Sequence, residues 1–140
     1  MRGDRLPDKD HISRYCKFKS LVNDQPSGAS FMLKPDKDKF LSVNWLEYFG
    51  LKDCQEQMSQ VRQNIRLNLA PMAKFAVLNV RTVINYVREN GPDNRALSVF
   101  HEPEEDDPSH SGIHGYGFED DWVADLIAEV VQETYPAREP

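Results

Sequence analysis

Apolar residues recur at two different spacings along the chain, and each spacing predicts one kind of element. Alternation of apolar and polar residues is typical of a strand with one buried face. Leu41, Val43 and Trp45 follow this pattern, and Ser42 and Asn44, which point the other way, are expected to face solvent. Short apolar runs between turn residues predict further strands. The segments that these signals mark are 10–16, 30–34, 40–48, 75–78, 96–100 and 111–116.

Apolar spacings of three and four residues predict three amphipathic helices. The first follows Asp53, which together with Glu56 resembles a capping box. The second ends at Asn90-Gly91, residues that tolerate the left-handed conformation of a helix C-cap. The third begins at Asp120-Asp121, where the helix dipole favours carboxylates. The apolar stripes of the three helices are Cys54, Met58, Val61 and Ile65; Val80, Val83, Ile84 and Val87; and Trp122, Val123, Leu126, Ile127, Val130 and Val131.

These elements predict the α+β class, with a small mixed sheet of five or six short strands and three helices. The order strand, helix, strand between residues 75 and 100 predicts a right-handed crossover that joins two parallel strands. We expect residues 10–135 to form a single α+β domain. A flexible lead-in at 1–9 precedes it, and a flexible tail at 136–140 follows it.

The distribution of charge narrows the classes of partner. The chain has a net charge of -6, but residues 101–140 hold 12 of its 23 acidic residues and one of its 17 basic residues, a net of -11. This acidic third argues against nucleic acid and favours a basic protein partner. No apolar run approaches the roughly 18 residues of a membrane helix, and the N-terminus lacks the apolar core of a signal peptide. We therefore expect a cytoplasmic protein without a membrane anchor, in which Cys16 and Cys54 are reduced thiols.

The densest group of titratable side chains lies between residues 101 and 114. His101, Asp107, His110 and His114 carry atoms that suit a divalent metal such as zinc, manganese or iron, and Glu102 adds a carboxylate. Their spacing matches no standard metal signature, so the alternative is a solvated acidic loop. The two prolines of this loop restrict its backbone, which favours fixed positions for His101 and His110.

The segment around Arg14 is the second candidate for a site. As a strand it places His11 on one face and Arg14 on the other, apolar face, where an arginine usually pairs with a carboxylate or meets an anion. In the structural alternative, Arg14 pairs with Glu47 or lies at a sheet edge. In the functional alternative, His11, Arg14 or Tyr15 joins the later histidines in one pocket, and the catalytic candidates are His11, Arg14, His101 and His110.

Three stretches of the chain resemble a family of small uncharacterised bacterial proteins. They are His11 to Tyr15, with the pattern His-x-x-Arg-Tyr; Leu41 to Phe49, which contains Leu-Ser-Val-Asn-Trp-Leu-Glu; and Phe100 to His110, which contains His-Glu-Pro-Glu-x-Asp-x-Pro-Ser-His. The resemblance implies a bacterial cytosolic setting. It brings no activity, cofactor or catalytic residue with it.

Two functions from different classes remain open. In the first, a small accessory or interaction protein docks a protein partner through its acidic C-terminal third and its histidine-bearing loop. In the second, a small hydrolase- or nuclease-like enzyme uses His101 and His110 as acid/base groups or metal ligands. The lack of a complete catalytic signature favours the first. An enzyme also requires His11, Arg14, His101 and His110 to converge on one concave pocket, so their positions distinguish the two.

Overall fold

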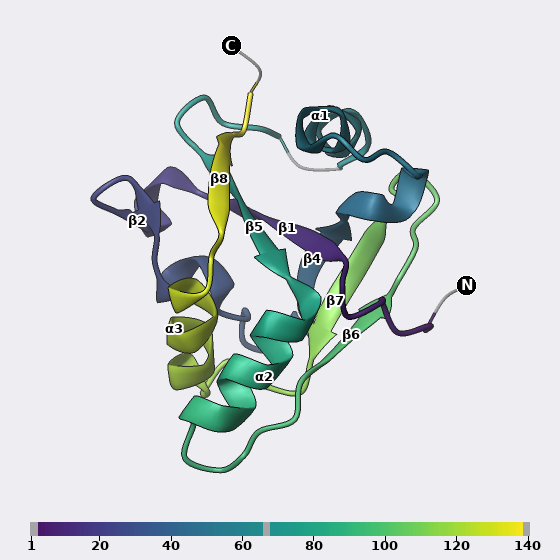
Figure 1. Cartoon of the computed structure of the whole chain (residues 1–140). Coiled ribbons are helices and arrows are strands. Elements are labelled where there is room, and N and C mark those ends of the chain that lie inside the picture. Colours follow the sequence, from purple (N-terminus) through teal and green to yellow (C-terminus); the bar gives the residue numbers. More distant parts are fainter. Residues whose placement is uncertain (1–2, 66–67, 139–140) are drawn as a thin grey trace.

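The computed structural model describes residues 3–65 and 68–138, and it confirms the α+β class (Figure 1). The α-helices in these residues are α1 (Cys54–Asn64), α2 (Val80–Asn90) and α3 (Asp121–Glu129), with 3-10 helices η1 (Phe18–Ser20), η2 (Gly28–Phe31) and η3 (Leu46–Phe49). The strands are β1 (His11–Cys16), β2 (Leu21–Val22), β3 (Gln25–Pro26), β4 (Leu41–Trp45), β5 (Lys74–Asn79), β6 (Ser98–His101), β7 (His110–His114) and β8 (Glu133–Pro136). Six of the described strands form one sheet in the order β6-β7-β4-β1-β5-β8, and β2 pairs with β3.

The large sheet is antiparallel at every described ladder, whereas a mixed sheet was expected. β5 and β6 do run in the same direction, because four antiparallel steps separate them. However, β1, β4 and β7 lie between them. The two strands on either side of α2 are therefore parallel, as expected, but they are not neighbours, since β1 occupies the place beside β5 and β7 occupies the place beside β6.

Packing overrides the local pattern at two places. Residues 30–34 were expected as a strand, but Phe31 instead ends the 3-10 helix η2, where its side chain is fully buried. This helix packs against α3 so closely that a Cβ on Gly28 would lie 1.9 Å from the carboxylate Oδ1 of Asp125. The strand β8 was not expected, because its four residues show no clear alternation. It extends the sheet by pairing with β5.

The two faces of the sheet carry separate apolar clusters, because successive residues of a strand point to opposite sides. On β5, Ala76 and Leu78 belong to the cluster that α2 and α3 cover, while Phe75 and Val77 belong to the cluster that α1 covers. α2 and α3 lie side by side and contact each other (Figure 1). α1 covers only part of the sheet face on which it lies, and the rest of that sheet face holds the candidate site described below.

Residues 3–6 are attached to the outer edge of β6. The amide of Gly3 donates to the carbonyl of His101 at 2.6 Å, and the amide of His101 donates to the carbonyl of Asp4 at 2.8 Å. The amide of Leu6 donates to the carbonyl of Val99 at 3.0 Å. These bonds cover an edge strand that would otherwise present unpaired backbone groups.

The two ends of the chain extend past the described residues. Residues 1–2 of the expected lead-in and 139–140 of the expected tail lie outside them. At the start of the expected tail, Pro136 pairs within β8, and the amide of Ala137 donates to the carbonyl of Ala73 at 3.0 Å. No helix in the described part of the chain is long and apolar enough to span a membrane.

Two predicted helix boundaries have different physical causes. Asp53 caps α1 as its sequence pattern predicts, since its side chain accepts a hydrogen bond from the amide of Gln55 at 3.2 Å. Gly91 ends α2 with a φ of -92°, which is not the expected left-handed conformation. A glycine is required there for steric reasons, because a Cβ would lie 2.2 Å from Cζ3 of Trp122.

We expect Gly91→Ala to lower the free energy of unfolding by about 1–3 kcal/mol, because the added methyl group displaces the indole ring of Trp122. Urea denaturation followed by tryptophan fluorescence measures the change. Gly117→Ala is the matched control, because the atom nearest its Cβ is the flexible carboxylate of Glu119, at 2.9 Å. We expect that control to change stability by less than about 0.5 kcal/mol. Equal losses in the two variants would contradict the steric explanation.

Candidate functional site

A cleft opens where β1 and β4 diverge. The ladder between these strands consists of Ile12 opposite Trp45 and Ser13 opposite Asn44. Beyond this point the cleft lies between the two strands, with a volume of about 260 Å³. Its lining residues are Ser13, Arg14, Tyr15, Phe40, Ser42, Asn44, Ile65, Glu104, Asp107 and His110.

Arg14 connects the two strands across the cleft. Its Nη1 donates to the carbonyl oxygen of Ser42 on β4 at 2.9 Å, beyond the last backbone pair. Its Nε donates to the carbonyl oxygen of Ser30 in η2, also at 2.9 Å. A single guanidinium group therefore joins β1, β4 and η2, and Arg14 is also one of the residues that line the cleft.

The charge of Arg14 has little compensation from the protein. Burial lowers the pKa of Arg14 from its ordinary value, and neighbouring charges such as the Asp38 carboxylate oppose this effect only in part. An arginine nevertheless stays charged at neutral pH. Among the described residues, no carboxylate forms an ion pair with Arg14. The pairing with Glu47 offered by the sequence does not occur, because Glu47 binds His11 instead.

Ser13, Asn44 and His110 form a row across three strands on the face that α1 partly covers. Ser13 lies opposite Asn44 in the β1–β4 ladder, and Asn44 lies opposite His110 in the β4–β7 ladder. Ser13 is 1% exposed, and its Oγ has no hydrogen-bond partner. A buried hydroxyl without a partner costs about 1–3 kcal/mol. The cleft wall therefore contains a polar group that the protein itself does not satisfy.

Asn44 anchors the acidic loop to the sheet. Its Nδ2 donates to Oδ1 of Asp107 at 2.8 Å and to Oγ of Ser109 at 3.0 Å, and all three residues are buried. The backbone groups of Glu104 and Asp107 bond reciprocally, at 3.2 and 3.1 Å, and close the turn of the loop. As a result, this loop is held against β4, and only its tip at residues 104–106 is exposed.

His110 lines the cleft with a defined tautomer. Its Nδ1 lies 2.8 Å from the carbonyl oxygen of Glu102, which can only accept, so Nδ1 carries the proton. In the tautomer that carries this proton, Nε2 is an acceptor. Oε1 of Glu104 lies 4.0 Å from Nδ1. A histidine in this state can accept a hydrogen bond or a proton from a bound molecule.

His101 projects from the opposite face of the sheet. In the β6–β7 ladder it lies opposite Ser111, which is adjacent in sequence to His110, so the two histidines point to opposite sides. The ring of His101 packs edge-on against Trp45, with 5.2 Å between centroids, and its Nε2 donates to the carbonyl of Pro108 at 2.8 Å. Its Nδ1 is buried without a hydrogen-bond partner. The sheet therefore separates the two histidines that were expected to act together.

Phe40 lies between the other two loop histidines, which do share a face. Its ring packs over Gly112, where a Cβ would lie 2.2 Å from Cδ1 of Phe40. The ring centroid of Phe40 is 4.7 Å from that of His114 and 6.0 Å from that of His110. The Nε2 atom of His114 lies 2.9 Å from Oε2 of Glu102, so His114 is paired with a carboxylate of the loop.

The described residues contain no group of three His, Cys, Asp or Glu side chains placed to hold a metal ion. The ligand set expected from the sequence comprises His101, Asp107, His110 and His114. These side chains do not come together: the sheet separates His101 from His110, the ring of Phe40 lies beside His114, and Asp107 is hydrogen-bonded to Asn44.

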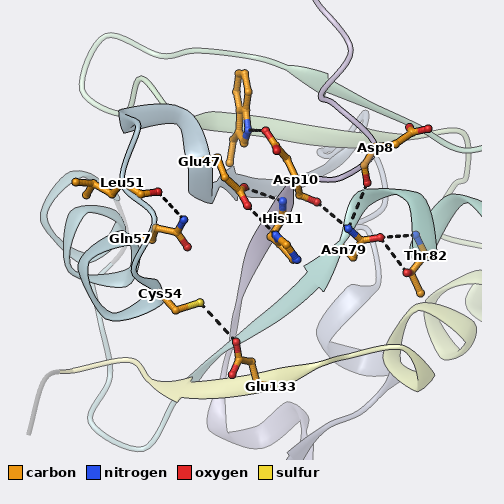
Figure 2. Close-up of polar contacts among 11 residues, drawn as sticks. Asp8, Asp10, His11, Glu47, Leu51, Cys54, Gln57, Asn79, Thr82 and Glu133 are labelled. Atoms are coloured by element: carbon orange, nitrogen blue, oxygen red, sulfur yellow. Dashed lines mark hydrogen bonds and ion pairs between the residues drawn. The ribbon is translucent and has the colours of Figure 1, made fainter.

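His11 belongs to a separate polar cluster and does not line the cleft (Figure 2). Its Nδ1 lies 2.7 Å from Oε2 of Glu47, and its backbone amide donates to Oε1 of the same carboxylate at 2.7 Å. In the same view, Sγ of Cys54 donates to Oε1 of Glu133 at 3.5 Å. Burial raises the pKa of the Cys54 thiol, a hydrogen bond with Tyr135 opposes this in part, and the carboxylate of Glu133 adds to the rise, which argues against a nucleophilic thiolate.

Of the four residues expected to be catalytic, Arg14 and His110 meet at the cleft, and His11 and His101 lie elsewhere. Sequence reasoning assigned Ser42 and Asn44 to a solvent face and did not include them in a site. The alternation along β1 and β4 places Asn44 and Ser13 on equivalent faces, but only the register puts them side by side. Comparison with known proteins finds no matching family model, curated protein or solved structure.

We expect Asn44→Ala to lower the free energy of unfolding by about 2–4 kcal/mol, because it removes two buried hydrogen bonds and one partner of the Asp107 carboxylate. Hydrogen–deuterium exchange should rise most in residues 102–110. Asn64→Ala is the matched control, since this partly exposed amide bonds only within α1. Equal exchange in the loop of both variants would contradict the anchoring role of Asn44.

Proposed function

We propose that this protein binds a small polar ligand in the cleft between β1 and β4. One observation carries the proposal: Ser13, whose buried hydroxyl has no hydrogen-bond partner, and Arg14, with which no described carboxylate forms an ion pair, are both among the residues that line the cleft. Buried polar groups are normally paired, because leaving them unpaired costs free energy. A polar ligand that pairs with one of these residues is therefore favoured.

The size of the cleft favours a ligand over a single ordered water. One water occupies roughly 30 Å³ of liquid volume, whereas the cleft has about 260 Å³. Small-molecule sites are usually somewhat larger, about 300–1,000 Å³. The cleft therefore suits a molecule at the small end of that range, with polar groups at defined positions.

Residues distant in sequence meet at this concavity. All the lining residues other than Phe40 and Ile65 come from the stretches 11–15, 41–49 and 100–110, on which the resemblance to the bacterial family rests. Each stretch contributes a polar group to the wall. This convergence supports a binding function more directly than the hydrolase-like alternative, which needed His101 beside His110.

A protein partner for the acidic loop is a second candidate, favoured by a separate observation. The side chains of residues 104–106 are exposed at the tip of a loop whose backbone is held by hydrogen bonds. A carboxylate cluster on a fixed loop attracts a basic surface and loses little conformational freedom on binding. This surface lies at the rim of the cleft, since Glu104 belongs to both.

We expect Ser42→Trp to abolish ligand binding without unfolding the protein, because Ser42 is exposed and an indole there fills the cleft. Saturation-transfer NMR with a library of small polar fragments measures binding, and thermal melting checks the fold. Gln55→Trp on α1 is the matched control, since it adds the same ring at an exposed position that does not line the cleft. Unchanged binding to the Ser42→Trp protein would contradict the proposed site.

For the second candidate, we expect the double variant Glu105→Lys/Asp106→Lys to lose a basic partner at low salt, since it reverses the charge of the loop tip. Affinity capture from a bacterial lysate at two salt concentrations measures this loss. Glu119→Lys is the control, because Glu119 is an exposed carboxylate outside the loop. If the unaltered protein, the double variant and the Glu119→Lys control all capture the same proteins, this result would contradict a role for the loop.

A further inference from the structure

We infer that the ligand of this cleft carries a primary ammonium group, which donates to the carboxylate of Glu104 and to Nε2 of His110. The carbon chain of the ligand packs against the rings of Phe40 and Tyr15. This inference rests on the proposed ligand-binding function and names the chemical class of the ligand.

The register of three strands decides which side chains face the cleft. Ser13 lies opposite Asn44, and Asn44 lies opposite His110, so these side chains share one face of the sheet. Tyr15 and Ser42 point to the same face, because each is two residues away from a member of this row along its own strand. All five residues line the cleft.

The guanidinium of Arg14 lies on the other face of the sheet. Arg14 stands between Ser13 and Tyr15 in β1, so its side chain points away from theirs. Its strand partner Ala76 belongs to the apolar cluster that α2 and α3 cover, and its Nε donates to the carbonyl of Ser30 in η2. Among the described side chains on the cleft face, no lysine or arginine therefore supplies a positive charge.

Glu104 gives the cleft a negative charge that the described residues do not neutralise. Its side chain is 42% exposed, and its Oε1 lies 4.0 Å from Nδ1 of His110. That nitrogen donates to the carbonyl of Glu102 at 2.8 Å. No described lysine or arginine forms an ion pair with Glu104. A cationic ligand supplies the missing charge, whereas an anionic ligand is repelled.

His110 places a neutral acceptor near that carboxylate. In the tautomer whose Nδ1 donates to the Glu102 carbonyl, Nε2 accepts. Ser42 is diagonal to His110 across the β4–β7 ladder, and its hydroxyl offers a third acceptor. A primary ammonium has three N–H donors and no acceptor, so it suits this set. An alcohol has one donor, and a carboxylate or phosphate dianion has none.

Two aromatic rings complete the lining. The ring centroid of Phe40 is 6.0 Å from that of His110. The hydroxyl of Tyr15 already accepts from the amide of Ala70 at 2.9 Å, so its ring is the part that remains for a ligand. Aromatic faces attract cations within about 6 Å of their centroids. With Ile65 at the end of α1, these rings suit a short carbon chain attached to the ammonium group.

The test compares matched amines, alcohols and acids on the full chain. The probes are butylamine, butanol and butanoate, together with benzylamine, benzyl alcohol and benzoate. Saturation-transfer NMR titration measures the affinities. We expect each amine to bind about tenfold more tightly than its alcohol, as charge-assisted hydrogen bonds predict. We expect the acids to bind no more tightly than the alcohols, because Glu104 repels them.

Three variants assign this preference to Glu104. Glu104→Gln should lower the affinity for amines to that for alcohols, because it keeps the shape of the side chain and removes its charge. Glu104→Asp should restore part of the preference, because the charge returns. Glu119→Gln is the matched control, since it removes an exposed carboxylate that does not line the cleft. It should leave the preference for amines in place, and thermal melting checks that all three variants fold.

The NMR signals of the histidine rings give a readout that needs no substitution. An amine that donates to Nε2 of His110 should shift the signal of that nitrogen, and the matched acid should not. His101 is the internal control, because its Nε2 bonds the carbonyl of Pro108 and its ring lies on the other face of the sheet. Its signal should stay in place.

The possible failures are distinguishable. Alcohols or acids that bind as tightly as their amines overturn the ammonium class. Amine binding that survives Glu104→Gln, or that leaves the His110 signal unchanged, overturns it as well. If no amine binds while Ser42→Trp still abolishes the binding of other polar fragments, the class of ligand is wrong and the proposed function stands. If no probe and no fragment binds, both are overturned.

Discussion

The side chain of Arg14 holds β1 and β4 together where their backbone pairing ends. The ladder stops at Ser13 opposite Asn44, and the guanidinium then bonds the carbonyl of Ser42 on β4 and that of Ser30 in η2. A planar group with donors along several edges can do this and still keep donors free. A lysine has neither the fork nor the reach across two acceptors. The residue that maintains the sheet is therefore also one of the residues that line the cleft.

The sequence predicted elements better than it predicted their arrangement. Periodic burial located all three described α-helices and every strand of the large sheet except β8, because one-sided burial leaves a pattern in the chain. It failed at residues 30–34, where the packing of η2 against α3 overrides local preference. It also failed to predict which strands pair, since alternation reports a buried face and does not identify the neighbour. The antiparallel order around β1 depends on contacts between segments far apart in the chain.

The candidate site shows the same limit at the level of single residues. The chemistry of Arg14 was foreseen correctly in one respect, that an arginine among apolar residues needs a partner, but the partners are carbonyls and not Glu47. The two loop histidines were expected to act together, yet a register that pairs His101 with Ser111 sends it to the face opposite His110. A shift of one residue would reverse this outcome. Residue types therefore indicated which side chains are chemically useful, while strand register decided which of them meet.

The cleft exists because one short helix leaves much of its face of the sheet uncovered. α1 has 11 residues and is about 16 Å long, whereas six strands at a spacing of about 4.8 Å span roughly 24 Å. On the other face, α2 and α3 together cover an apolar cluster. Under α1 the apolar cluster includes residues of β5 and of η3, and the strands beyond it carry the row Ser13, Asn44 and His110. If this part of the face were apolar and uncovered, it would favour aggregation. If it were polar and fully solvated, the hydroxyl of Ser13 would bond water and would not be buried. The acidic loop is anchored to this row by Asn44, so partial coverage of the face leaves a cleft with polar residues in its lining and a buried hydroxyl, that of Ser13, beside it.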